Sequence, residues 1–143
     1  MLEFQKQILT ELVEHDALLI MSPGLGLFKI FSSFLELYTK ENHFVLVLNT
    51  DQAQDMAIIE KQTSLGLLRH ERMQIVDAET HADTRCVCPT WSDFLSNFKG
   101  NRNAMYRKGG VFSVTSRILA VDLLLERVPT AMISGIVVYN AHR

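Results

Sequence analysis

The chain has 143 residues, of which 48% are hydrophobic and 21% charged, and its formal net charge is −2. That length suits one domain with a core, the apolar fraction is too high for intrinsic disorder, and no apolar run reaches the ~18 residues that a membrane-spanning helix needs. With 14 basic and 16 acidic residues, the chain as a whole exerts no electrostatic attraction on nucleic acid, so any such binding must come from a local patch.

The first part of the chain reads as helix, strand, helix. Apolar residues at three- and four-residue spacing predict an amphipathic helix over about residues 2–15. The continuous apolar run at 17–21 is bounded by a Ser-Pro-Gly turn and predicts a short buried strand. A second helical face follows over residues 27–38.

Most of the remaining chain continues the alternation. Apolar runs predict strands at 44–48, 74–77, 110–114 and 133–139, and helical patterns predict helices at about 51–63 and 116–125. Continuous apolar strands that alternate with helices favour a parallel sheet covered on both faces. The predicted fold class is α/β and doubly wound, with a single domain over residues 1–143.

Residues 78–108 do not follow this pattern. They are polar and mixed, and we expect an irregular, mobile insertion with a short helix at 90–98. Trp91 lies among basic residues that could track a nucleic-acid strand. Acidic residues dilute that charge, so a solvated loop is the favoured interpretation.

A glycine-rich turn precedes the helix at 27–38, in the place of a phosphate-binding loop. No window fits the pattern G-x-x-x-x-G-K-[ST], because the residues after Gly26 are Leu27 and Phe28, and Lys29 comes two positions late. A glycine pattern for dinucleotides fails as well, since it needs glycine at Lys29. A structural turn is favoured, and anion binding through the turn's amides stays open.

Four segments together carry a resemblance to a known family. They read LIMSPGLG at 19–26, VLVLNT at 45–50, GGVFSVTSRIL at 109–119 and GIVVYNAHR at 135–143. In this order they resemble the N-terminal helicase-like region of the XPF family of DNA-repair endonucleases. The match runs from about residue 2 to residue 143, apart from residues 70–104.

The resemblance implies a RecA-like, incomplete helicase lobe whose ATPase motifs are degenerate. Leu27 stands where the phosphate-binding lysine belongs, and Phe28 replaces the hydroxyl that holds magnesium. Tyr139 and Asn140 replace the acidic pair of the second motif. The positions of the two degenerate motifs are Gly24, Gly26, Leu27, Phe28, Tyr139, Asn140 and His142. Phosphoryl transfer depends on charge stabilisation by the lost groups, so we expect no ATP hydrolysis, no cofactor and no metal.

The same resemblance predicts a hollow at the position where the ATPase groups are missing. We expect Leu27 and Tyr139 to face a common hollow, with the strand at 17–21 beside the last strand of the chain.

The resemblance also implies contact with nucleic acid at the ends of strands. The candidate DNA-contacting residues are Thr50, Thr115, Ser116 and Arg117. Hydroxyls, helix N-terminal amides and an arginine suit phosphate contact. Thr115 or Ser116 could instead cap the helix that begins there, and both roles can hold at once.

The expected function follows from the family. The resemblance implies an inert scaffold for single-stranded or branched DNA, binding weakly as this piece, within a nuclear endonuclease of nucleotide-excision and interstrand-crosslink repair. That family cuts DNA as a heterodimer with a small partner subunit. Its carboxylate-rich nuclease motif and its C-terminal dimerisation region are not found in this sequence, so we expect a fragment with no intact active site and no membrane contact. Two alternatives stay open: a nucleotide- or small-molecule-binding α/β enzyme that uses the Gly24–Gly26 loop, and a purely protein-binding piece that docks through residues 2–13.

Two further clusters contain residue types that are found in metal or acid–base sites. Cys86 and Cys88, with His70 and His81 upstream, match zinc-ligand spacing poorly and are interpreted as ordinary reduced cysteines. Asp122 and Glu126 lie four residues apart on one helix and could form a metal or acid–base pair. A surface salt bridge from Glu126 to a nearby arginine is the favoured interpretation.

Overall fold

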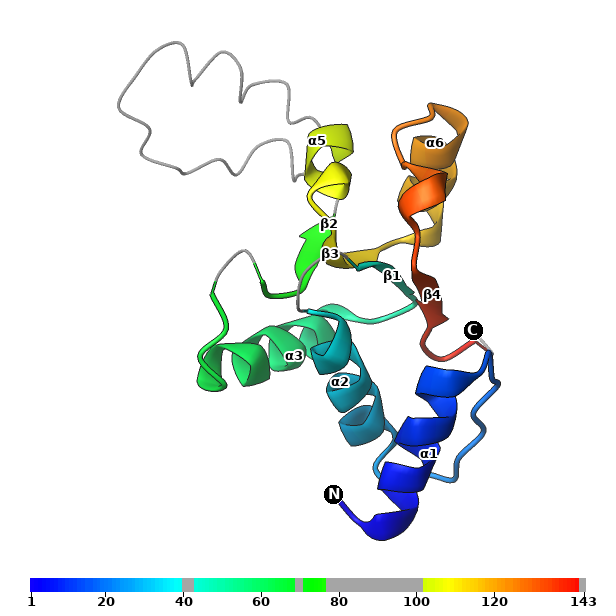
Figure 1. The fold of residues 1–143 in the computed structure, drawn as a ribbon, viewed down its shortest axis with the longest axis vertical. Helices are drawn as coiled ribbons and strands as arrows, with labels where there is room; N and C mark the ends of the chain where they lie inside the picture. Colours follow the sequence, from blue (N-terminus) through cyan, green and yellow to red (C-terminus); the bar gives the residue numbers. More distant parts are fainter. Residues whose placement is uncertain (40–42, 69–70, 77–101, 142–143) are drawn as a thin grey trace.

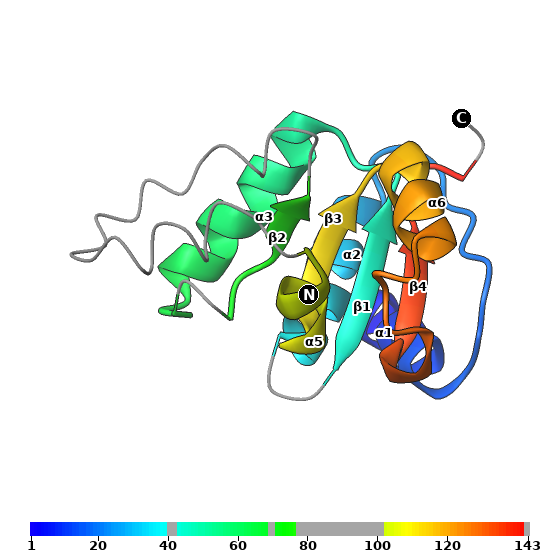
Figure 2. The same ribbon diagram turned by 90° about the horizontal axis from the view of Figure 1, so that it is seen from above.

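A four-stranded parallel sheet forms the centre of the molecule, in a computed structural model that describes residues 1–39, 43–68, 71–76 and 102–141. The strand order is β2-β3-β1-β4, and each neighbouring pair is parallel. Figure 2 shows the four arrows side by side and pointing the same way. The strands are β1 (Phe44–Leu48), β2 (Gln74–Val76), β3 (Gly110–Val114) and β4 (Gly135–Val138). The four strands predicted from 44 onwards are therefore confirmed, with small shifts at their ends.

Helices cover both faces of this sheet. The helices are α1 (Glu3–Glu14), α2 (Leu27–Tyr38), α3 (Gln52–Ser64), α5 (Arg102–Arg107) and α6 (Ser116–Leu124), with a 3-10 turn at Thr130–Met132. Figures 1 and 2 show α2 and α3 on one face and α5 and α6 on the other, while α1 packs against α2. This confirms the α/β prediction and is consistent with a RecA-like fold. None of the helices in the described ranges is long and apolar enough to cross a membrane.

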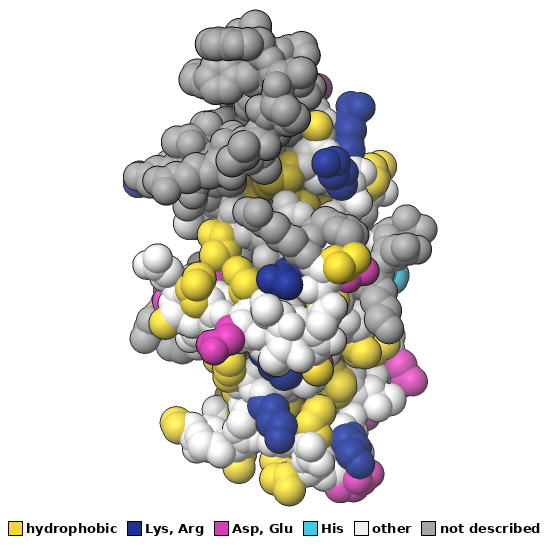
Figure 3. Space-filling model, turned by 90° about the vertical axis from the view of Figure 1, so that its left-hand side faces the viewer, with side chains coloured by type: hydrophobic (Ala, Val, Ile, Leu, Met, Phe, Trp, Pro, Cys, Tyr) yellow, Lys and Arg dark blue, Asp and Glu magenta, His cyan; other side chains and the backbone are white. Residues whose placement is uncertain are grey.

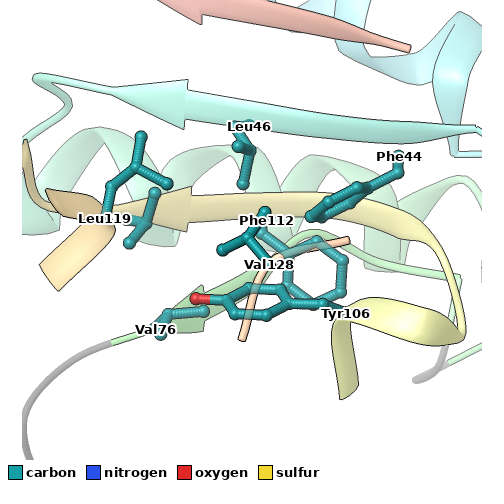
Figure 4. Close-up of a cluster of buried hydrophobic side chains, with 8 residues drawn as sticks. Phe44, Leu46, Val76, Tyr106, Phe112, Leu119 and Val128 are labelled. Carbon is teal, nitrogen blue, oxygen red and sulfur yellow. The ribbon is translucent and has the colours of Figure 1, made fainter. Parts of the chain in front are cut away.

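The side chains of β1 contribute to two hydrophobic cores, one on each face of the sheet. Val45 and Val47 point to α2 and α3, whereas Phe44 and Leu46 point to the opposite face. Successive side chains of a strand point to opposite faces, so a strand buried on both sides needs an unbroken apolar run. Figure 4 shows the second core, built from Phe44, Leu46, Val76, Tyr106, Phe112, Val114, Leu119 and Val128.

Two helices begin immediately after a strand, each with its own side-chain cap. The Gln54 amide donates to Asp51 Oδ1 at 2.8 Å, and the Asp51 amide donates to Gln54 Oε1 at 3.1 Å, which starts α3 after β1. The Ile118 amide donates to Thr115 Oγ1 at 3.4 Å, which starts α6 after β3. Such caps satisfy amides that have no partner within the helix. The capping role predicted for Thr115 is confirmed.

The strand predicted at 17–21 is wrong. These residues form neither helix nor strand, and the side chains of Leu18 and Ile20 are 78% and 84% exposed. An apolar run becomes a strand only where a neighbouring strand takes up its backbone hydrogen bonds. Among the described strands β4 pairs with β1 alone, and its outward-facing Ile136 and Val138 are about half exposed.

The prediction of an irregular insertion is wrong at its C-terminal end. Residues 102–107 form α5, and Tyr106 is fully buried with its ring 5.6 Å from that of Phe44 and 5.4 Å from that of Phe112. A helix that contributes to the core cannot be a loose loop. The predicted helix at 90–98, together with Cys86, Cys88 and Trp91, lies outside the described residues.

Asp122 is a buried anchor and not one half of a surface pair. Its carboxylate is fully buried, accepting hydrogen bonds from Tyr106 Oη at 2.9 Å, Arg102 at 3.1 Å and Arg127 at 3.3 Å. Burial raises the pKa of the Tyr106 hydroxyl, and its hydrogen bond to the Asp122 carboxylate raises that pKa further. The expected salt bridge from Glu126 is replaced by these three contacts, which join α5 to α6 across the core. Glu126 itself is exposed.

Loss of the Asp122 carboxylate should destabilise the fold strongly. We expect Asp122→Ala to lower the free energy of unfolding by about 3–5 kcal/mol, because it leaves the buried Tyr106 hydroxyl without its acceptor and removes the carboxylate that faces Arg102 and Arg127. Tyr106→Phe should cost about 1 kcal/mol, and less than that in the Asp122→Ala background. Urea unfolding followed by circular dichroism measures both, with Glu126→Ala as the control. Equal effects of Asp122→Ala and Glu126→Ala would contradict the anchor.

Candidate functional site

The carboxyl ends of three strands meet at one edge of the sheet. Thr50 follows β1, Thr115 follows β3 and Tyr139 follows β4. The register pairs Val47 with Ser113, and the Thr50 and Ser113 hydroxyl oxygens lie 3.0 Å apart. Ligands of open α/β sheets bind outside this edge. The edge therefore contains the candidate site, and the sequence placed Thr50 and Thr115 on it correctly.

The glycine turn is closed by a side chain that sequence reasoning missed. Gly24 and Gly26 both have positive φ, +87° and +84°, and Gly26 is the N-cap of α2. Gln5 of α1 is buried, its Nε2 donates to the Leu25 carbonyl at 3.0 Å, and its Oε1 accepts from the Leu2 amide. A Cβ on Gly26 would lie 2.7 Å from Gln5 Nε2. Because an amide fills the inside of the turn, the structural interpretation of this turn is favoured over anion binding.

Lys29 lies on the α1 side of the turn. Its ammonium group is near the Met1 amino group and lowers the pKa of that group by charge repulsion. Lys29 does not line the hollow described next. A lysine in this position cannot act in place of the missing P-loop lysine.

An apolar hollow of about 280 Å³ lies between Phe28 and Tyr139, one residue from each of the two segments that the resemblance aligns with ATPase motifs. Its lining residues are Phe28, Asp51, Ala53, Gln54, Ala57 and Tyr139. The Tyr139 ring stacks on Phe31 of α2 with centroids 4.6 Å apart and an interplanar angle of 29°. The prediction that Leu27 and Tyr139 face a common hollow beside a strand at 17–21 is wrong. Phe28 lines the hollow with Tyr139, and the start of α3 completes it where that strand was expected.

The electrostatics of this hollow oppose a nucleotide. Burial raises the pKa of the Tyr139 hydroxyl, and the nearby Asp51 carboxylate raises it further. No cationic side chain is among the lining residues. Asn140 lies in the turn after β4 with φ +50°, and His142 is outside the described residues. Phosphate groups entering here would meet a carboxylate and two aromatic rings, and nothing that offsets their charge.

The hydroxyls of the site differ in their surroundings. Thr115, Ser116 and Arg117 are exposed at the N-terminus of α6, which points its free amides and partial positive charge toward this edge. Thr50 is half-buried and held by Ser113. On the face drawn in Figure 3, the basic side chains of the described residues are scattered among hydrophobic and acidic ones. Within the described ranges, no group of three or more His, Cys, Asp and Glu residues could hold a metal ion.

Comparison with known proteins supports the resemblance seen in the sequence. No protein-family model matches the chain. The chain is 34% identical over its full 143 residues to the DNA repair endonuclease XPF of Cricetulus griseus, of which it covers 14%. It is 31% identical to the DNA repair endonuclease UVH1 of Arabidopsis thaliana and 32% identical to the DNA repair protein RAD1 of Saccharomyces cerevisiae, covering 13% of each. The chain therefore spans about one seventh of the length of these relatives.

The apolar lining of the hollow predicts that the chain does not bind nucleotide. Isothermal titration with Mg-ATP at millimolar concentrations should give no saturable binding, because the residues that line the hollow include no lysine, no Ser or Thr hydroxyl and no acidic pair for the phosphates and the metal. Titration with magnesium alone and with ATP alone provides the controls. Micromolar binding of Mg-ATP, or ATP hydrolysis that is lost in Gly26→Ala, would contradict this account.

Proposed function

Since the whole chain matches one segment of the XPF-type DNA repair endonucleases, we propose that it is the helicase-like lobe of such a protein and contacts DNA without hydrolysing ATP. The lobe extends over residues 1–143, and any insertion is limited to the region before α5. Its role is that of a scaffold in nucleotide-excision and interstrand-crosslink repair in the nucleus. The cutting reaction and the small partner subunit belong to the longer protein.

One observation carries this proposal: hydroxyls lie at the carboxyl edge of the sheet, while the adjacent hollow is lined by aromatic rings and no cationic side chain. Tyr139 stacks on Phe31 where a nucleotide's phosphates would need charge, and Gln5 fills the glycine turn. These contacts argue against the alternative of a nucleotide-binding enzyme that uses the Gly24–Gly26 loop. The exposed Thr115, Ser116 and Arg117 have no comparable obstruction.

The chemistry of this edge suits the backbone of a single DNA strand. Arg117 supplies one positive charge beside the N-terminus of α6, where backbone amides favour an anion. The carboxylate of Asp51 lies at the neighbouring helix start and works against this attraction. The proposed affinity is therefore weak, and it fits a lobe that contributes to DNA binding by a larger protein.

A second candidate function, docking to protein, is supported by exposed apolar side chains. Leu2, Phe4 and Val13 of the α1 region are 62%, 38% and 47% exposed, and Leu18 and Ile20 are more exposed still. Figures 1 and 2 show the segment between α1 and α2 passing on the β4 side of the molecule. Phe4 and Leu18 line one surface hollow together, and exposed apolar surface is typical of a site that binds another protein. The two functions use different surfaces and are compatible.

The DNA contact is tested by removing one arginine at the site and one far from it. Arg117→Ala should weaken binding to a forked DNA severalfold and reduce the slope of log affinity against log salt by about one, because one phosphate contact is lost. Fluorescence anisotropy at several salt concentrations measures both. Arg107 is the matched control, an exposed arginine at the end of α5, before β3 begins.

Two outcomes would contradict the proposal. One is binding to the fork that does not depend on salt. The other is an equal loss of affinity in Arg117→Ala and Arg107→Ala, which would place the contact elsewhere.

A further inference from the structure

Three polar side chains form a chain of hydrogen bonds beneath the carboxyl edge of the sheet. Ser113 Oγ donates to Asp55 Oδ2 at 2.9 Å, and the hydroxyl oxygens of Ser113 and Thr50 lie 3.0 Å apart. Asp55 and Ser113 are each 5% exposed, whereas Thr50 is half-buried and ends the chain at the surface. The residues come from α3, β3 and the end of β1, so the fold and not local sequence brings them together.

Counting protons fixes the direction of these bonds. An ionised carboxylate only accepts, so the single hydroxyl proton of Ser113 points to Asp55. The contact between Thr50 and Ser113 then requires the Thr50 proton to point inward to Ser113 Oγ. The pKa of Asp55 is raised, first by burial and further by Asp51 at the start of the same helix, while the hydroxyls of Thr50 and Ser113 act in the opposite direction. The Ser113 proton thus points to the Asp55 carboxylate, and the Thr50 proton points inward to Ser113.

The outward side of Thr50 Oγ1 is left with lone pairs and no proton. A lone pair accepts from a donor, and it repels a phosphate oxygen, which also only accepts. The deoxyribose-phosphate backbone offers acceptors alone, whereas base edges offer N–H groups and ribose offers the 2′-hydroxyl. The direction of the bonds therefore decides which part of a nucleic acid Thr50 can contact.

We propose that Asp55, acting through Ser113, sets the Thr50 hydroxyl as a hydrogen-bond acceptor, so that Thr50 contacts a donor group of the bound nucleic acid and not a phosphate. Asp55 is a positioning residue that never touches the strand. This inference rests on the proposed nucleic-acid contact, and it assigns Thr50 a different contact from the phosphate binding expected of Thr115, Ser116 and Arg117.

The test compares single strands that differ in donors. An oligodeoxyadenylate offers base amino groups, a strand of tetrahydrofuran abasic units offers acceptors alone, and an oligoriboadenylate adds the 2′-hydroxyl. Thr50→Val should weaken binding to the deoxyadenylate strand about three- to tenfold, the range of one hydrogen bond, and leave the abasic strand unchanged. A loss confined to the ribose strand would identify the 2′-hydroxyl as the donor. Equal losses on all three strands, or no loss on any, would overturn the proposal.

Removal of the Asp55 carboxylate should reverse the direction of the hydrogen bond between Ser113 and Thr50. In Asp55→Ala the Ser113 proton has Thr50 Oγ1 as its acceptor, and the Thr50 proton then turns outward to a phosphate. We expect tighter binding to the abasic strand in Asp55→Ala but not in Asp55→Ala/Thr50→Val. A gain that persists in the double variant would assign the effect to the lost charge of Asp55 and overturn the proposal.

A measurement without nucleic acid separates this inference from the proposed function. The pKa of Asp55, followed by the carboxyl ¹³C shift, should be higher in Ser113→Ala and in Thr50→Val than in the unaltered chain, because the first variant loses the donor to the carboxylate and the second loses the hydroxyl that donates to Ser113. Unchanged pKa values would overturn the inference even if the chain binds DNA. Raised values together with no DNA binding would refute the proposed function alone, with the hydrogen-bond chain itself upheld.

Discussion

Parallel pairing of β1 with both β3 and β4 is the constraint on which the rest of the site depends. Because the three strands run the same way, the residues that follow them, Thr50, Thr115 and Tyr139, come to one edge although they are far apart in the sequence. The same pairing buries β1 on both faces, so α2 with α3 and α5 with α6 must cover the sheet. The parallel pairing of β1 therefore determines both the fold and the position of the site.

At this edge the molecule has a glycine turn and an apolar hollow that both lack the groups a phosphate needs. The turn at Gly24 and Gly26 is filled by the Gln5 amide, and the hollow is lined by Tyr139, which stacks on Phe31. Aromatic contacts of this kind are stabilising, so the stack also helps to hold α2 against the sheet. The hydroxyl groups on the β3 side of β1 take no part in this aromatic stack and can contact a ligand.

Local pattern predicted most of the fold and only part of the site. The strand at 44–48 and the helix start at Asp51 occur where the apolar run and the capping residue predict them. The strand at 17–21 failed because apolarity indicates burial without supplying a neighbouring strand. The Asp122 anchor, the Gln5 plug and the bond from Ser113 to Asp55 join segments between about 16 and 60 residues apart, and polar pairing over such distances leaves no periodic signal in one sequence. Tyr106 was missed for the same reason.

The central claim is that Tyr139 stacks on Phe31 beside the hollow where the family resemblance places ATPase motifs, and nuclear Overhauser spectroscopy of the 143-residue chain tests it most directly. The account predicts cross-peaks between the ring protons of Tyr139 and Phe31, which disappear in Tyr139→Ala while the amide spectrum stays dispersed. A folded chain whose Tyr139 ring shows no cross-peak to Phe31 would contradict it.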